Sequence, residues 1–164
     1  MTEILLSWLN GIPGELVVFV LAMAPIVELR AALPLALTVY DFSIPFSWLL
    51  VVIGNMIPAF FIIYGWHWLV EHIAKVWPWF GGLMNKWYEK VQGQWDEKIE
   101  KYGPWALVLF VAIPLPGSGV WSGALAAWIF QLNKKKALIS IFFGVLLSAL
   151  IVTIITLGGV SLFT

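Results

Sequence analysis

The chain has 164 residues, of which 62% are hydrophobic and 11% are charged, and its formal net charge is zero. This composition excludes an ordinary soluble domain, because a core of this size would need a far more polar shell. The neutral balance argues against a nucleic-acid partner, and the lack of cysteine excludes disulfides and thiol chemistry. We therefore expect a single integral membrane domain over residues 1–164.

The first predicted element is a pair of short apolar helices with a break between them. Residues 16–27 give about 18 Å of helix, enough to reach the middle of a bilayer, and residues 31–40 give about 15 Å for the return. Pro25 interrupts the apolar stretch near the turn. These lengths predict a re-entrant hairpin, which enters the membrane and leaves it on the same side.

Glu28 and Arg30 lie within this broken apolar stretch. An ionised residue at the centre of a membrane helix costs roughly 2.5–3.5 kcal/mol, so two together need a reason. One reason is structural: the side chains neutralise each other, or Arg30 caps exposed carbonyls at the hairpin tip. The other is functional, with Arg30 as an anion anchor because its fork suits phosphate or carboxylate. Glu28 is then a candidate proton carrier, since burial favours the protonated carboxyl.

A spanning helix is predicted over residues 46–70, which is long enough to cross the hydrocarbon core. Its interior holds Asn55, which could bond to a hairpin tip, touch substrate or join helices, and Pro58, which would kink the helix. The polar stretch that follows predicts an amphipathic helix along the membrane surface. Its apolar face recurs at Met84, Trp87 or Tyr88, Val91, Trp95, Ile99 and Tyr102.

The second hairpin is predicted from residues 105–113 and 120–133, and a second spanning helix from residues 137–160. The tip of this hairpin contains no charged side chain. Its glycines permit positive φ and close backbone approach, so exposed N–H groups could cradle an anion; alternatively, the glycines only allow the tight reversal. Ser118 and Ser122 add hydroxyls, and Trp121 either faces substrate or packs.

The candidate binding residues come from both hairpins and from the first spanning helix. No catalytic motif, metal-ligand set or cofactor signature is present, so we expect neither an enzyme nor a bound cofactor. The candidate substrate- or ion-binding residues are Glu28, Arg30, Pro34, Asn55, Pro114, Pro116, Gly117, Ser118, Gly119, Trp121 and Ser122.

A fixed offset between the two halves indicates an internal duplication. Pro25 and Pro114 lie 89 positions apart, and the same offset aligns Gly14 with Gly103. Breaks at corresponding positions of two halves are a pointer to a transporter site at the repeat interface. The predicted boundaries are residues 14–75 for the first repeat, 76–102 for the linker and 103–164 for the second repeat.

The lysines decide the predicted topology. All basic residues except Arg30 are lysines, and they lie in the central polar stretch or in the run 134–136. They share one face of the membrane only if both hairpins are re-entrant, and the positive-inside rule then makes that face cytoplasmic. The predicted fold class is an all-α integral membrane protein, an inverted repeat of re-entrant hairpin plus transmembrane helix with a central amphipathic interfacial helix.

Two stretches of the chain resemble the small multidrug export protein family of bacterial and archaeal membrane proteins: ELRAALPLAL at residues 28–37 and PLPGSGVWSGAL at residues 114–125. The resemblance covers nearly the whole chain and implies a multi-pass protein of a prokaryotic inner membrane. That family is similar to the wider DedA group, whose members pair two re-entrant hairpins and include polyprenyl-phosphate lipid translocases. By resemblance, Glu28 and Arg30 match the acidic and basic residues of the first hairpin. DedA proteins usually carry a further arginine in the second hairpin, where this chain has glycine and serine.

These observations predict a small transporter or lipid translocase for an amphiphilic, anionic, lipid-phosphate-like substrate, with protonation of Glu28 as the coupling step. The expected partners are membrane lipids, this substrate and protons. A homodimer or larger assembly is also expected, because two spans and two hairpins make a thin wall around a midplane cavity. One alternative is an exporter of amphiphilic cationic drugs with Glu28 as the counter-charge. Another is a non-transporting membrane scaffold in which Glu28 and Arg30 only hold the hairpin.

Overall fold

The computed structural model describes residues 12–76, 79, 82, 97–114 and 118–163, and all the regular structure within these residues is helical. This confirms the all-α prediction for the described part of the chain. The helices are α2 (Gly14–Met23), α3 (Glu28–Thr38), α4 (Ile44–Val76), α6 (Glu97–Ala112), α7 (Val120–Ile129) and α8 (Lys134–Phe163).

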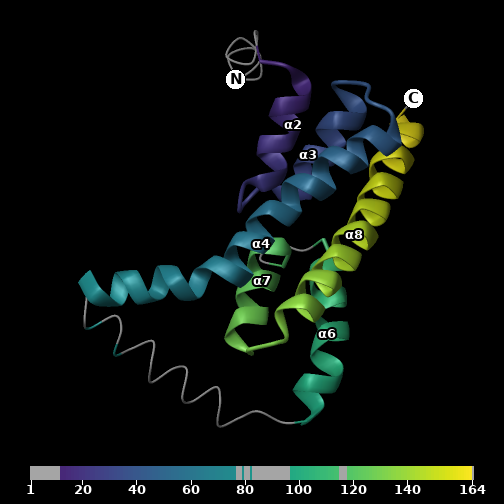
Figure 1. Cartoon of the computed structure of the whole chain (residues 1–164). Helices are drawn as coiled ribbons and strands as arrows, with labels where there is room; N and C mark the ends of the chain where they lie inside the picture. Colours follow the sequence, from purple (N-terminus) through teal and green to yellow (C-terminus); the bar gives the residue numbers. More distant parts are fainter. Residues whose placement is uncertain (1–11, 77–78, 80–81, 83–96, 115–117, 164) are drawn as a thin grey trace.

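Two helices are long and apolar enough to cross a membrane, as predicted. The spanning-length parts are Ile44–Gly65 of α4 and Lys134–Gly159 of α8. About half of each is buried against other helices, and large apolar side chains cover much of the rest: Phe61 is 67% exposed and Ile154 is 62% exposed. An apolar outer surface of this kind suits lipid rather than water. The last turns of α4 run away from the other helices (Figure 1).

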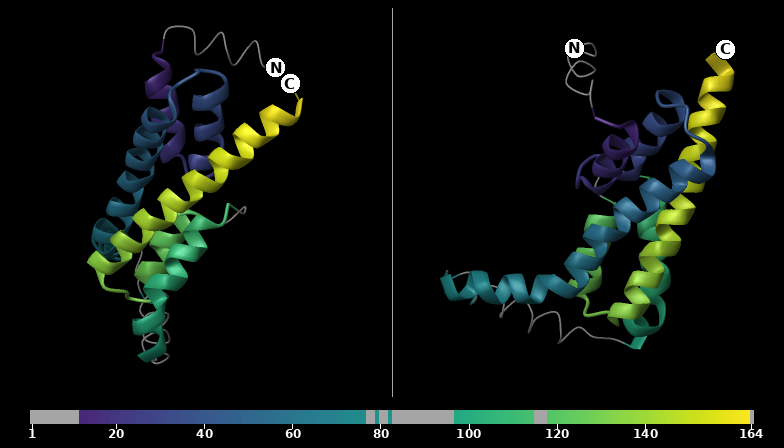
Figure 2. Two further views of the ribbon diagram at one scale, coloured as in Figure 1. Left: turned by 90° about the vertical axis from the view of Figure 1, so that its right-hand side faces the viewer. Right: turned by 45° about the horizontal axis from the view of Figure 1, so that its top comes forward.

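Each long helix is preceded by a helix–break–helix unit, α2–α3 before α4 and α6–α7 before α8. We call the interruption between α2 and α3 the first break and the interruption between α6 and α7 the second break. The two units approach from opposite ends of the molecule, so the two breaks lie together near its middle (Figures 1 and 2). The first break follows from sequence, because the residue before a proline is pushed out of helical geometry. Ala24, which precedes Pro25, has φ −70° and ψ 136° and ends α2.

The first unit packs closely on its long helix at a glycine. A Cβ atom added to Gly54 of α4 would lie 2.9 Å from the Ala22 Cβ and 2.9 Å from the Phe19 carbonyl oxygen of α2. Real Cβ atoms essentially never approach neighbours this closely. Gly54 therefore lets the backbones of α2 and α4 come into contact.

The second unit makes the equivalent contact. A Cβ atom added to Gly144 of α8 would lie 2.7 Å from the Val111 Cβ and 2.9 Å from the Val108 carbonyl oxygen of α6. Val108 and Val111 are the residues that the 89-residue offset pairs with Phe19 and Ala22. The two glycines, Gly54 and Gly144, lie 90 positions apart, so the contact of the first half recurs within one residue of the matching position in the second half.

The second unit begins earlier than predicted. The linker was expected to run to Tyr102, but α6 begins at Glu97 and continues through Pro104 into the apolar limb. Ile99 and Tyr102 therefore belong to the same helix as that limb. The other positions of the predicted amphipathic face, Met84, Trp87, Tyr88, Val91 and Trp95, lie outside the described residues.

Candidate functional site

Glu28 is the first residue of α3 and projects from the first break toward the second. The residue is only 6% exposed. Its Oε1 accepts a hydrogen bond from the Trp121 backbone N–H at 3.3 Å, and the neighbouring Val120 backbone N–H also stabilises the carboxylate. These N–H groups belong to the first turn of α7, where a helix has free donors and favours negative charge. The second break thus cradles an anion, as its glycines suggested, and that anion is the protein's own carboxylate.

The backbone of Glu28 is strained. Its φ is 48°, in the left-handed region that non-glycine residues rarely occupy. Such a conformation costs on the order of 1–3 kcal/mol and persists only where the surroundings enforce it. The contacts with α7 provide that enforcement, which ties the shape of the first break to the presence of the second.

Gly119 makes the approach of Glu28 possible. A Cβ atom at this position would lie 2.1 Å from the Glu28 Oε2 atom, and Gly119 has φ 132°, which side chains rarely allow. The close contact requires glycine on both counts. Gly119 thus uses the positive φ and the close approach that glycine permits.

Arg30 binds the second break through Ser118. Its Nη2 atom donates to the Ser118 carbonyl oxygen and, at 2.9 Å, to the Ser118 Oγ. The Ser118 hydroxyl in turn donates to the Ile113 carbonyl oxygen at 2.6 Å, at the end of the other limb. The guanidinium therefore caps carbonyl and hydroxyl oxygens left free where the helix is interrupted.

Trp121 fastens the two breaks from the other direction. Its indole Nε1 donates to the Met23 carbonyl oxygen at 3.0 Å, the last residue of α2. The side chain is half-buried. Its observed role is packing and hydrogen bonding between the breaks, which is one of the two readings left open by the sequence.

Asn55 lies beside these groups in the middle of α4. Together with Glu28 and Arg30 it lines a cavity of about 10 Å³, room for a single water. Asn55 is 1% exposed; its Nδ2 donates to the Val51 carbonyl oxygen at 2.8 Å, and its Oδ1 has no partner among the described residues. A buried acceptor without a donor is costly, so this cavity can hold a water or a ligand N–H or O–H.

The remaining sequence candidates divide into three groups. Pro114 follows the end of α6 and shapes the second break, and Ser122 lies half-buried in the first turn of α7. Pro34 lies inside α3, away from the tip, where its carbonyl oxygen accepts a hydrogen bond from the Thr38 hydroxyl at 2.8 Å. Pro116 and Gly117 lie outside the described residues.

One polar neighbour was missed by sequence reasoning. Ser148 of α8 is 5% exposed and lines the same small cavity as Asn55. The only available signal was a hydroxyl in an otherwise apolar stretch of the second spanning helix. A single serine in such a helix commonly bonds to its own backbone, so nothing in the sequence distinguished Ser148 from other serines.

The two charged side chains of the first break find their hydrogen-bond partners in the second break. The carboxylate and the guanidinium both come from the first break, and each is satisfied by neutral groups of the second. Within the described residues, no ion pair joins Glu28 to Arg30. Glu28 and Arg30 thus have different hydrogen-bond partners in the second unit, and each could exchange its partner for another ligand.

The fold and the contacts between the two breaks define a class: a small helical membrane protein whose two broken units meet through a buried carboxylate and a half-buried guanidinium. The profile of the family described as "Putative small multi-drug export protein" matches residues 28–151. The chain belongs to this family. No curated protein and no solved structure matches it.

Proposed function

We propose that this protein is a small transporter that moves an amphiphilic anion, of the lipid-phosphate kind, through the junction between the two breaks. Arg30 binds the anionic head group, and the first turn of α7 completes the anion site. The protein acts as a carrier and makes no covalent change in its cargo. One observation carries this proposal: an anion cradle is present at the junction, and the Glu28 carboxylate occupies it.

The junction as described is a closed state. The cavity beside Glu28 and Arg30 has room for about one water, so a head group enters only if the two breaks separate. Separation releases Arg30 from Ser118 and the α7 amides from Glu28. A phosphate offers oxygen acceptors to the freed donors, so the hydrogen bonds that are lost can be replaced by bonds to the substrate.

Protonation of Glu28 favours the exchange. A neutral carboxyl is a weaker acceptor for the α7 amides than a carboxylate, because charge-assisted hydrogen bonds are roughly twice as strong. Protonation therefore loosens the internal anion from its cradle and admits the external one. Coupling to protons follows, because substrate anion and Glu28 carboxylate compete for one site.

The membrane arrangement follows the same proposal. The two units are re-entrant hairpins that enter from opposite faces, and α4 and α8 are the spanning helices. The breaks then meet near the midplane, where inverted-repeat transporters bind their substrates. Equivalent glycine contacts in the two halves support this repeat. Irregular backbone at that depth is tolerable where it is buried in protein or lines a polar cavity.

A binding experiment tests the proposal. Native mass spectrometry would measure the binding of a polyprenyl phosphate to wild type, Arg30→Ala and Glu28→Gln between pH 5 and 8. We expect Arg30→Ala to weaken binding by roughly tenfold to a hundredfold, because a hydrogen bond to a charged group contributes about 1.5–3 kcal/mol. Wild type should bind more tightly as the pH falls, and Glu28→Gln should lose the part of the pH dependence that the carboxyl causes.

Two controls separate this result from simpler ones. The phosphate itself titrates, and Glu28→Gln reports that effect alone, because it lacks the carboxyl. Lys75→Gln removes an exposed positive charge on α4 and should leave binding unchanged. Binding that is equal in wild type and Arg30→Ala would refute the transport site and favour a scaffold, in which Glu28 and Arg30 only join the units. Tight binding of an amphiphilic cation that Glu28→Gln abolishes would instead indicate drug export.

A further inference from the structure

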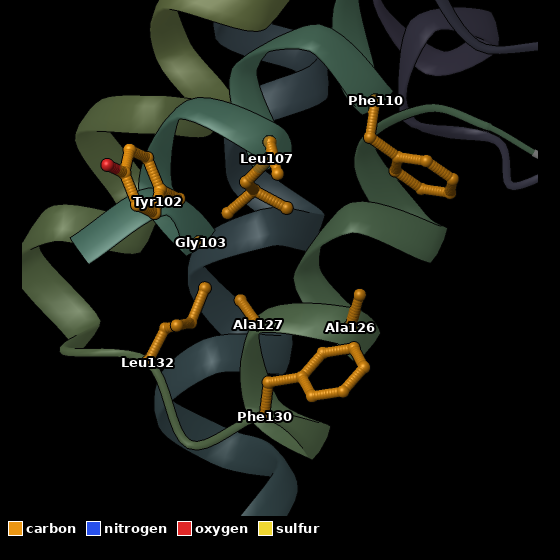
Figure 3. A pocket seen from close by; sticks show the side chains of 9 residues that line it. Tyr102, Gly103, Leu107, Phe110, Ala126, Ala127, Phe130 and Leu132 are labelled. Carbon is orange, nitrogen blue, oxygen red and sulfur yellow. The ribbon is translucent and has the colours of Figure 1, made fainter. Parts of the chain in front are cut away.

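A second, apolar cavity opens between α6 and α7 of the second unit. It has a volume of about 500 Å³, and we call it the α6–α7 groove. Figure 3 shows its walls, with Gly103, Leu107 and Phe110 on one side and Ala126, Ala127 and Phe130 on the other. Nearly all of the lining is apolar, and Phe110 and Phe130 are 41% and 43% exposed. The groove is therefore suited to a hydrocarbon chain.

The first unit explains why this groove is open. The 89-residue offset pairs Gly103 with Gly14. In the first unit a Cβ atom on Gly14 would lie only 2.5 Å from the Tyr40 ring, and that ring stacks on Phe42 with centroids 5.5 Å apart. The residues paired with Tyr40 and Phe42 by the same offset are an isoleucine and a glutamine. The Tyr40 ring therefore covers the first glycine, whereas the second glycine lines the groove.

Positive charge lies at one end of the groove. Ala127 and Leu132 line both the groove and a neighbouring cavity of about 260 Å³, which Lys134 also lines. Lys134 is exposed and begins α8, followed by two more exposed lysines. The ammonium of Lys134 lies 5.3 Å from the centre of the Tyr64 ring of α4. The cavity that adjoins the groove therefore carries the positive charge of Lys134, at the start of α8.

We propose that the α6–α7 groove binds one acyl chain of an anionic membrane lipid, whose phosphate lies at Lys134. The apolar walls take the chain, and the lysine run at the start of α8 selects the negative head group. Basic sites beside membrane helices recognise anionic lipids in this way, and each lysine near the surface contributes roughly fivefold in affinity. The phosphate belongs to a lipid and not to a free ion, because the groove beside it needs a hydrocarbon occupant.

This site is separate from the junction at Glu28 and Arg30. It requires no transport, and its tests alter neither of those residues. The lipid-binding proposal can therefore fail while the transport proposal stands, and the reverse is equally possible.

The first test compares two lipids that differ only in head group. Native mass spectrometry of the full chain in detergent would measure the binding of phosphatidylglycerol and phosphatidylcholine with identical acyl chains. We expect a preference for phosphatidylglycerol that Lys134→Gln lowers about fivefold. Lys75→Gln removes another exposed lysine near a helix end and should leave the preference unchanged. Equal binding of the two lipids, or equal effects of the two variants, would overturn the proposal.

The second test fills the groove. Ala106 is exposed and lines the groove, so Ala106→Phe should weaken the binding of both lipids. Leu109→Phe places the same ring on an exposed position of α6 outside the groove and should have no effect. A dimer that takes up no lipid, and that Ala106→Phe weakens, would mean that a second copy of the chain covers the groove.

A covalent test does not depend on any variant. Phosphatidylglycerol with a photoactivatable diazirine in the acyl chain would be crosslinked to wild type, and the labelled peptides sequenced. Labelling concentrated in residues 102–110 and 126–132, and reduced by excess unlabelled phosphatidylglycerol, is the expected result. Labelling spread evenly over the exposed faces of α4 and α8 would contradict a specific site.

Discussion

At the scale of single residues, the junction depends on how a buried carboxylate and a half-buried guanidinium are satisfied. Removing a charged group from water costs several kcal/mol, which only close hydrogen bonds offset. Glu28 has the amides of α7, and Arg30 has the oxygens of Ser118. If either charged side chain is replaced, the groups that it contacts in the second break lose their hydrogen-bond partner. Glu28 and Arg30 therefore affect stability as well as binding. Their effects must be measured separately, which the binding series at several pH values does.

Gly119→Ala tests the contact between the two breaks. The added Cβ would lie 2.1 Å from Glu28 Oε2, and the backbone has φ 132°. We expect a loss of roughly 1–3 kcal/mol, measured as a lower midpoint of thermal unfolding in detergent.

Gly65→Ala is the matched control for this substitution. Gly65 lies within α4, and a Cβ atom there meets nothing within 4 Å. The change should be neutral or raise stability by up to about 1 kcal/mol, because alanine is the better helix former. Equal midpoints for Gly119→Ala and Gly65→Ala would show that the breaks do not touch as described.

At the scale of helices, the molecule is held by close backbone contacts at glycines. Without a hydrophobic drive between helices in lipid, such contacts and interhelical hydrogen bonds dominate association. Gly54 joins α4 to α2, and Gly144 joins α8 to α6. Trp48 adds a hydrogen bond from its Nε1 to the Thr153 hydroxyl at 2.9 Å, which links the two long helices.

Gly54→Ala and Gly144→Ala should destabilise the protein to a similar degree. Each adds a Cβ atom under 3.0 Å from a neighbouring side chain and a backbone carbonyl, and overpacking of this kind costs typically about 1–3 kcal/mol. Thermal unfolding of both variants beside Gly65→Ala would check the expectation. If one tolerates alanine and the other does not, the two halves are not equivalent at this contact.

How far the sequence could predict these elements depends on the signal behind each. Hydropathy located both spanning helices to within a few residues at their starts, and Pro25 located the first break, because both signals are local. The pairing of Arg30 with Ser118 joins residues 88 positions apart, and nothing local encodes it. The same is true of Ser148 beside Asn55, since helix rotation decides which hydroxyl faces the junction. Pro34 was assigned to the site from its place in the motif, but it lies along α3 instead.

At the scale of the whole molecule, two units meet at their breaks while two long helices cross beside them (Figure 2). The 89-residue offset relates the halves but not their chemistry. Arg30 is paired by this offset with Gly119, so the charged side chain of one half corresponds to the glycine that makes room in the other. In the resulting junction, one break supplies the charged side chains and the other supplies backbone groups and the Ser118 hydroxyl.

The orientation of the units in the membrane gives a further prediction. The chain lacks cysteine, so single cysteines at the exposed positions Asp41, Lys75 and Lys135 can report sidedness. A membrane-impermeant maleimide added to intact cells should label Asp41→Cys alone, and all three after permeabilisation. Labelling of Lys75→Cys and Lys135→Cys from opposite sides would mean that the hairpins span the membrane.

The central claim is that Glu28 and an anionic substrate alternate in one site, and lipid translocation in proteoliposomes tests it most directly. A fluorescent polyprenyl phosphate would be followed across the bilayer with wild type, Glu28→Gln, Arg30→Ala and Lys75→Gln at several pH values. We predict that wild type and Lys75→Gln translocate the lipid at a rate that depends on pH. Glu28→Gln should translocate it without the pH dependence that the carboxyl causes, and Arg30→Ala should translocate little. Wild type no faster than protein-free liposomes, or Arg30→Ala as fast as wild type, would contradict the account.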